Sequence, residues 1–367
     1  MAATESLPVL MYHYISNHAN SIAVAPELFE LHCRTLTAHG WQGVSLAEAE
    51  SYFLHGEPLP EQSCLITLDD GYLDNYVHAW PILEKYGQKG VIFAVAERVA
   101  ASTTPRPTLR DVWEKRLART ELPCVDMPLV PHADGYVARK DMFFSWEEAR
   151  RMEQSGVISV ASHSLTHTSV FTGSGYSGFL LPGDRKRTFD ATLDRYWGLP
   201  LFPQKPALAH QAFIPSEQLA AAIKNLVPQD EHEAYVFAAD TTNIEKLHKL
   251  AREMADSLGD FEDGDAMLVR MRHELAEGKR CLEQGLGHAV HSLCWPWGAY
   301  CGLSLELGKE LGFTCFYTTR EGANPPGDGT AIRRFKAKAK GAPWLRSRLW
   351  VYSRPWLGNV YARCRCI

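Results

Sequence analysis

The stretch CLITLDDGYLDNYVHAWPILEKYGQKGVIFAVA (residues 64–96) predicts a strand, a helix and a second strand in immediate succession. Its first apolar run has the length of a buried strand and ends in two adjacent aspartates, Asp69 and Asp70. A helix over about 73–86 ends at Gly87, and the run GVIFAVA begins the next strand. A helix between two such strands predicts that the strands are parallel.

The same alternation recurs before and after this unit. A strand (8–15) and an amphipathic helix (26–39) precede it. Beyond position 142 the expected elements are, in order, a helix (143–156), a strand (157–162), a helix (266–284), a strand (289–296), a helix (303–311) and a strand (314–319). The chain is therefore expected to be an α/β protein with a mainly parallel sheet or barrel.

Two segments interrupt the alternation and are expected to be insertions. Residues 101–142 are rich in proline and charge, with one helix near 108–119, and residues 168–265 begin rich in glycine and proline and end in helical stretches. We expect one domain over 1–330 that carries both insertions, followed by a C-terminal extension over 331–367.

Composition allows a full core but conceals a charge asymmetry. The 367 residues are 46% hydrophobic and carry a net charge of −5. The extension, 331–367, has ten lysines and arginines and no acidic residue, which leaves −15 on the rest. Three tryptophans interleave with these basic residues, a combination that suits an anionic membrane surface. The alternative is a plain solvated tail; nucleic acid could use similar chemistry, but no other feature supports it, so none is expected.

The cellular location is expected to be cytoplasmic. The first residues, MAATESLPVLMYHYIS, have no basic region and a short, interrupted apolar run, and no run approaches a spanning helix. The nine cysteines form no CxxC pair, so reduced thiols are expected. If the 331–367 segment binds lipid, the protein would lie peripherally on the inner leaflet.

Two histidines follow a predicted strand in the motif HSLTH, at His163 and His167. With one aspartate they would make a three-ligand metal site, as in hydrolytic metal centres. No glutamate lies between them, so a general base must come from elsewhere, and either Asp69 or Asp70 could supply it. Taken alone, an HxxxH pair is a weak signal and an Asp-Asp pair is often a turn or a helix cap. Both motifs directly follow apolar strands, however, and the loops after such strands commonly form active sites.

Three segments of the chain together resemble a known family. They are ITLDDGYLDNY with the residues to position 95, FFSWEEARRMEQSGVISVASHSLTH, and LCWPWGAY. They resemble the polysaccharide deacetylases of the NodB-homology group, carbohydrate esterase family four. The resemblance implies a distorted (β/α) barrel and metal-dependent hydrolysis of N-acetyl groups, less often O-acetyl groups, on glycans.

Site residues follow from the matched motifs. The resemblance implies that Asp69 is the general base and that Asp70, His163 and His167 bind a divalent ion such as Zn²⁺, with Co²⁺, Ni²⁺ or Fe²⁺ as alternatives. WPWGAY resembles a motif whose backbone N–H after the proline holds the oxyanion, here that of Trp297.

Two family features have no clear counterpart in this sequence. No clear copy of the L-x-H motif that carries the general acid is found near the C-terminus. MYH resembles an N-terminal motif of some members, which implies that His13 has this role; the alternative is a histidine hydrogen-bonded at the strand end. The arginine that orients the base is also unmatched, and Arg333 in AIRRF is the expected substitute. The aromatic-rich segment 195–213 could stack against sugar rings or form an exposed hydrophobic cap on the insertion.

These features lead to one expected function and two rivals. The expected enzyme removes N-acetyl groups from an amino sugar of a bacterial surface glycan or its lipid-linked precursor, a lipopolysaccharide core included. Its partners would be the N-acetylated glycan or glycolipid and an anionic membrane surface. The rivals are a catalytically inactive glycan-binding subunit and an O-acetyl esterase.

Overall fold

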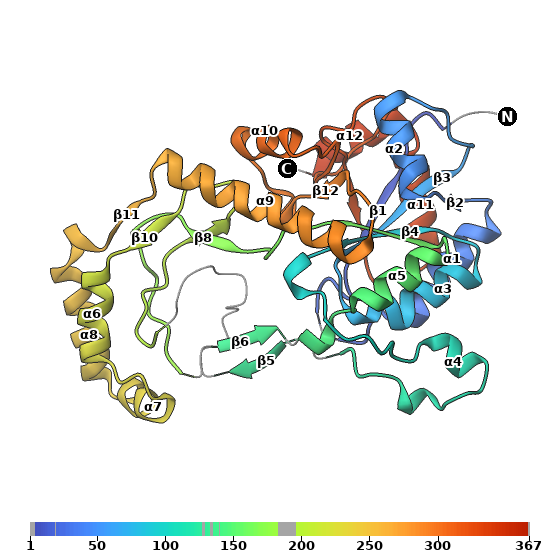
Figure 1. The fold of residues 1–367 in the computed structure, drawn as a ribbon. Coiled ribbons are helices and arrows are strands. Elements are labelled where there is room, and N and C mark those ends of the chain that lie inside the picture. Colours follow the sequence, from blue (N-terminus) through green and yellow to red (C-terminus); the bar gives the residue numbers. More distant parts are fainter. Residues whose placement is uncertain are drawn as a thin grey trace.

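The computed structural model describes residues 4–18, 20–126, 129–132, 135–138, 140–182 and 196–365 (Figure 1). Its centre is a parallel sheet in the order β13-β12-β7-β4-β3-β1-β14, and β2 pairs with β3. The strands are β1 Val9–Tyr12, β2 Gln42–Gly43, β3 Ser63–Asp70, β4 Gly90–Ala94, β7 Ile158–Ser162, β12 Ser292–Cys294, β13 Cys315–Tyr317 and β14 Phe335–Lys336.

The sheet curls until its two edges approach each other. An isolated parallel bridge joins Tyr317, in the edge strand β13, to Ile332, which precedes the other edge strand. The backbone N–H of Thr318 donates to the carbonyl of Ile332 at 2.8 Å. The expected fold, an α/β protein with a distorted barrel, is therefore confirmed as a curled parallel sheet.

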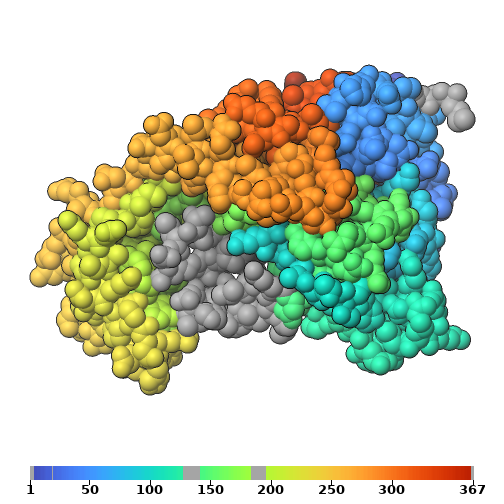
Figure 2. All heavy atoms as spheres, in the orientation of Figure 1, coloured from blue at the N-terminus to red at the C-terminus, as the bar shows by residue number. Residues whose placement is uncertain are grey.

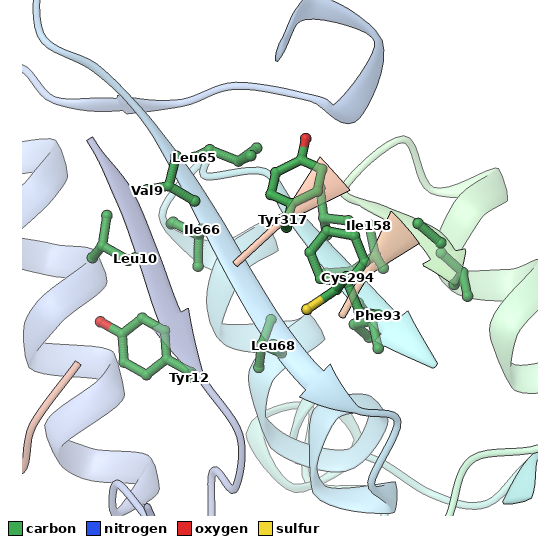
Figure 3. Packing of buried hydrophobic residues seen from close by; sticks show 14 of the residues in the cluster. Val9, Leu10, Tyr12, Leu65, Ile66, Leu68, Phe93, Ile158, Cys294 and Tyr317 are labelled. Atoms are coloured by element: carbon green, nitrogen blue, oxygen red, sulfur yellow. The ribbon is translucent and has the colours of Figure 1, made fainter. Parts of the chain in front are cut away.

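The core fills the inside of the curl (Figure 3). Phe93 of β4 packs against Tyr317 of β13, with ring centroids 4.7 Å apart. Two strands, β7 and β12, separate β4 from β13 in the sheet, so this contact crosses the interior. All eight residues of β3 are buried, as is typical of parallel strands covered on both faces.

Helices cover the outside of the sheet. They are α1 Pro26–Ala38, α2 Leu46–His55, α3 Trp80–Lys85, α5 Trp146–Gln154, α9 Gly264–Leu286 and α10 Gly302–Glu310. Helix α5 begins with the expected capping box of Ser145 and Glu148. The expected helix over 73–86 is a π-helical turn, Asn75–Ala79, that continues into α3. Helix α2 was not predicted, although Ser45 and Glu48 form the same capping box.

The first insertion contains α4 Leu109–Trp113 and the hairpin of β5 Leu129–His132 and β6 Gly135–Ala138. The second is a separate unit with its own apolar cluster (Figure 2). Its elements are β8 Ser169–Phe171, β9 Gln204–Pro206, β10 Phe213–Pro215, α6 Glu217–Leu226, α7 Glu231–Ala239, α8 Thr241–Glu253 and β11 Gly259–Phe261. Tyr196, Trp197 and Phe202 are buried in that cluster, so for these residues both expectations, stacking against sugar and an exposed hydrophobic cap, are wrong.

The basic C-terminal segment is mostly helical. It contains β14, then α11 Ala342–Tyr352 and α12 Pro355–Arg365. Strand β14 pairs with β1, so the parallel sheet extends a few residues past the expected domain boundary at 330. The domain limits otherwise stay predictions. Among the described residues, no helix combines the length and the apolar character needed to cross a membrane.

Candidate active site

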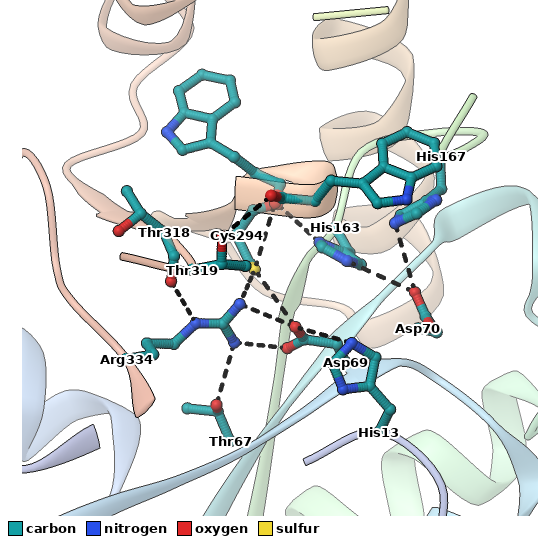
Figure 4. A network of polar contacts seen from close by, with 12 residues as sticks. His13, Thr67, Asp69, Asp70, His163, His167, Cys294, Thr318, Thr319 and Arg334 are labelled. Carbon is teal, nitrogen blue, oxygen red and sulfur yellow. Dashed lines mark hydrogen bonds and ion pairs between the residues drawn. The ribbon is translucent and has the colours of Figure 1, made fainter. Parts of the chain in front are cut away.

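The six residues expected to form the site lie where β1, β3, β7 and β12 end. Figure 4 shows His13, Asp69, Asp70, His163 and His167 together, and Trp297 packs against His167. Asp69 and Asp70 end β3, and the motif HSLTH directly follows β7. His13 directly follows β1, and Trp297 lies in the short turn after β12. Because the strands are parallel, their carboxyl ends meet at one end of the barrel and bring these distant segments together.

Asp70, His163 and His167 form a buried cluster of possible metal ligands. Oδ1 of Asp70 lies 3.6 Å from Nε2 of His163 and 3.6 Å from Nε2 of His167. Ligands about 2.0–2.2 Å from a tetrahedral zinc ion lie roughly 3.3–3.6 Å apart, so the observed spacing suits such an ion. A second group of three potential ligand residues, Asp69, His163 and Cys294, overlaps the first.

The protonation of this cluster also fits a cation. Nδ1 of His163 donates to the carbonyl of Cys294 at 2.8 Å, which leaves the Nε2 lone pair facing Asp70. Burial lowers the pKa of His163 and lowers that of His167 to about 3, so both rings are neutral near pH 7. Oδ1 of Asp70 is buried without a hydrogen-bond donor among the described residues. A cation between Asp70 and the two neutral imidazoles would compensate this buried carboxylate oxygen.

Asp69 is held by a buried arginine, Arg334. Nη1 of Arg334 donates to Oδ1 of Asp69 at 2.6 Å, and Nη2 donates to Oδ2 at 2.8 Å. The same guanidinium donates to the carbonyl of Thr318, to the hydroxyl of Thr67 and to the sulfur of Cys294. Burial opposes ionisation of Asp69, but Arg334 and the nearby histidines hold the pKa of its carboxyl below the usual value.

The expectation that Arg333 orients the base is wrong. Its Nη1 donates to Oδ1 of Asn359 and to the carbonyl of Ala323, on the other side of the chain from Asp69. Neighbouring residues in extended backbone project in opposite directions, so only one of two adjacent arginines can enter the barrel. Arg334 is that residue, and it is 1% exposed.

His13 and Trp297 flank the two aspartates. Nε2 of His13 lies 3.8 Å from Oδ2 of Asp69, and its side chain is 18% exposed. The indole of Trp297 packs against the ring of His167, with centroids 4.2 Å apart, and is 40% exposed. His13 therefore faces the carboxylate rather than only a backbone group, and Trp297 forms an open edge of the site.

Left-handed backbone is concentrated at this site. Among the described residues, six that are not glycine have a positive φ angle, and four of them are Asp70, Ser164, His167 and Trp297. Each such conformation costs about 1–3 kcal/mol and persists only where the surrounding structure enforces it. The strain shows that packing around the site fixes these backbone angles.

Helix α9 fixes the loop that carries the two histidines. The carboxylate of Glu274 accepts hydrogen bonds from the hydroxyl of Ser164 and from both the backbone and the hydroxyl of Thr166. One turn further along the helix, Gly278 lies directly against the same loop. No local sequence pattern predicts either contact, because more than 100 residues separate Glu274 from the loop.

Gly278→Ala is expected to weaken zinc binding about tenfold or more, as changes behind metal ligands usually do. A Cβ at this position would lie 2.8 Å from the backbone nitrogen of Leu165, and the loop would have to move. Competition with a chromophoric chelator measures the affinity. Gly264→Ala, in the same helix with open space around it, is the control and should bind zinc like the parent. Equal zinc affinity of the parent and both variants would show that contact with α9 does not hold the histidine loop in its metal-binding position.

Part of this chain is similar to known proteins. Residues 56–190 match the family model described as polysaccharide deacetylase. YxkH of Bacillus subtilis, whose name places it among polysaccharide deacetylases, is 45% identical over 94 residues, 25% of this chain and 33% of that protein. The poly-beta-1,6-N-acetyl-D-glucosamine N-deacetylase of Escherichia coli K12 is 27% identical over 165 residues, 44% of this chain and 20% of that protein.

A solved structure shares the whole fold. The de-N-acetylase from Aggregatibacter actinomycetemcomitans aligns over 93% of this chain and 99% of its own, with a TM-score of 0.59 and 18% identity. The curated relatives extend well beyond the matched segments, which span one third or less of their length. The matched residues contain Asp69, Asp70 and both histidines, so the segment 56–190 matches a polysaccharide deacetylase domain.

Proposed function

We propose that this chain is a metal-dependent N-deacetylase that acts on an amino sugar of a bacterial surface glycan or of its lipid-linked precursor. The observation that carries the proposal is that two adjacent carboxylates have different partners. Asp70 faces two neutral histidines, whereas Asp69 is turned to Arg334 and His13. A metal-binding carboxylate beside a separately held carboxylate is what amide hydrolysis with a general base requires.

Asp70, His163 and His167 would hold the ion, and Zn²⁺ is the ion that we propose, because three protein ligands with an open position are typical of catalytic zinc. A bound divalent ion would supply Lewis-acid polarisation of the acetyl carbonyl. The neutral histidines and the otherwise unpaired Oδ1 of Asp70 support this assignment.

The remaining residues would transfer protons and stabilise the negative charge that develops on the acetyl oxygen. Asp69 accepts a proton from the water that attacks the acetyl carbon, and Arg334 keeps its carboxylate oriented toward that water. The backbone N–H of Trp297 stabilises the oxyanion. As the carbon–nitrogen bond breaks, His13 donates a proton to the leaving amine. The products are acetate and a free amino sugar.

Acetate release from matched oligosaccharides tests this proposal. The substrates are oligomers of N-acetylglucosamine in β-1,6 and β-1,4 linkage and an O-acetylated oligosaccharide without N-acetyl groups. We expect acetate from an N-acetylated oligomer and little from the O-acetylated one. The opposite preference would indicate an esterase, and binding of the oligomers without acetate release would indicate the inactive glycan-binding subunit.

The proposal includes a peripheral position at the inner leaflet of the cytoplasmic membrane. On α11 and α12, Trp350, Trp356 and Val360 are at least half exposed. The guanidinium of Arg354 lies 4.5 Å from the ring centre of Trp350, which places positive charge beside an exposed aromatic ring. Exposed tryptophans with adjacent arginines support binding to an anionic interface.

Trp350→Ser with Trp356→Ser is expected to abolish most co-sedimentation with vesicles of phosphatidylcholine and phosphatidylglycerol. Trp113→Ser, which removes an exposed tryptophan from α4, should leave co-sedimentation unchanged. Truncation after Thr330 is a poor alternative, since it would also remove Arg334 and β14. Equal sedimentation of the double variant and the parent, or no binding by the parent, would contradict the membrane proposal.

A further inference from the structure

A pocket rich in arginine lies beside the catalytic centre. Its volume is about 710 Å³, and it lies between the segment after β13 and helix α12. Three arginines line it, from three separate parts of the chain: Arg320, Arg333 and Arg363. Glu321 is the one acidic residue among the described residues of the lining, and its carboxylate accepts a hydrogen bond from the hydroxyl of Tyr352.

The position of Arg333 is fixed by its surroundings. Its Nη1 donates to Oδ1 of Asn359 at 2.8 Å and to the carbonyl of Ala323 at 3.2 Å. The side chain lies against Gly322, where an added Cβ would come within 2.5 Å of Cδ of Arg333. The glycine therefore leaves the space that this arginine occupies, and Asn359 on α12 anchors one end of the guanidinium.

The other edge of this guanidinium is available to a ligand. Within the described part of the chain, Nε and Nη2 of Arg333 have no hydrogen-bond partner. These atoms form one of the two-donor edges with which arginine binds oxyanions in a bidentate manner. Over the same residues, the side chains of Arg320 and Arg363 have no ion-pair partner either. Three arginines against a single glutamate in the described lining leave a net positive charge around the pocket, which favours an anion.

Thr319 connects the pocket to the catalytic centre. It lines the pocket, and its hydroxyl donates to the carbonyl of Trp297 at 3.1 Å. The preceding residue, Thr318, accepts a hydrogen bond from Arg334, which holds Asp69. A glycan bound at the catalytic centre would therefore have the arginines next to the edge formed by Trp297.

We propose that this pocket binds a phosphoryl group of the substrate, attached close to the sugar that is deacetylated. A phosphoryl group offers several acceptor oxygens and up to two negative charges, enough for three arginines, whereas a carboxylate satisfies a single bidentate arginine. The inference rests on the proposed deacetylase function and narrows its substrate to a phosphorylated glycan or glycolipid.

Calorimetric titration of the zinc-loaded chain tests this inference. The ligands are N-acetylglucosamine, its 1-phosphate and the methyl phosphodiester of that phosphate. We expect at least one phosphorylated ligand to bind about tenfold more tightly than the parent sugar, since hydrogen bonds to charged groups are the stronger ones. Tighter binding of the monoester indicates a phosphate substituent, and tighter binding of the diester indicates a phosphate that links the sugar to a carrier.

Arg333→Gln and Arg363→Gln, made separately, should each remove most of this preference. Arg346→Gln is the matched control, because it removes the same charge from α11 outside the pocket. No preference for either phosphorylated ligand, or an equal loss in all three variants, would overturn the inference. Binding is measured without turnover, so a chain that binds phosphorylated sugars but releases no acetate would refute only the proposed function.

Discussion

Asp69→Asn is expected to lower kcat for acetate release by about 10²- to 10⁴-fold, the usual contribution of a general base. The amide cannot take a proton from the attacking water. Zinc content should stay near that of the parent, since Asp69 is turned to Arg334 while Asp70 faces the two histidines. Acetate release and zinc stoichiometry, measured on the same preparation, separate these two effects.

Asp74→Asn is the matched control for this variant. Asp74 is a buried aspartate in the same segment, and burial raises the pKa of its carboxyl well above the usual value. An amide keeps the shape of this carboxyl, whose neutral form is favoured by burial, so this variant should keep kcat within about threefold of the parent. If Asp69→Asn kept the parent turnover, the base would have to be another group.

Arg334→Met is expected to destabilise the fold by about 3–5 kcal/mol, because it leaves the Asp69 carboxylate buried without its partner. Acetate release should fall as well, since the carboxylate loses both hydrogen bonds that orient it. Urea unfolding gives the free energy, and Arg333→Met, at a partly exposed neighbour, should cost no more than about 1 kcal/mol.

The double variant Asp69→Asn with Arg334→Met separates the loss of the Asp69–Arg334 ion pair from the loss of side-chain packing. Because the neutral pair no longer buries an uncompensated charge, it should be more stable than Arg334→Met alone and still inactive. If the two single losses of stability simply added, Asp69 and Arg334 would not be coupled in the way that their two hydrogen bonds imply.

Local sequence signals predicted most of the parallel sheet. Strands β3 and β4 are apolar runs next to a glycine. The aspartate pair ends β3, and the histidine motif directly follows β7. Helix α2 has no predicted counterpart although SLAE carries a capping box, because its partly polar run lies between the predicted helix 26–39 and the strand that begins at Cys64. Strong local patterns thus identified the elements on which the candidate ligands lie.

The contacts that depend on distant partners could not be predicted. Arg334 meets Asp69 across 265 positions, and the choice between it and Arg333 depends on the register of β14 beside β1. Glu274 contacts the histidine loop because α9 packs across it, and no local sequence pattern predicts that packing. Tyr196 and Trp197 are aromatic whether they face sugar or a core, and only the tertiary structure shows that they face a core.

The most direct test asks whether Asp70, His163 and His167 hold the ion on which deacetylation depends. The chain is first treated with a chelator and then titrated with Zn²⁺, and both acetate release and bound zinc are measured at each step. We expect activity to rise in parallel with binding and to saturate at about one zinc per chain, as at a single three-ligand site. His163→Ala with His167→Ala should bind zinc far more weakly and release no acetate. Full acetate release by the zinc-free chain, or zinc bound as tightly by the double variant, would contradict the account.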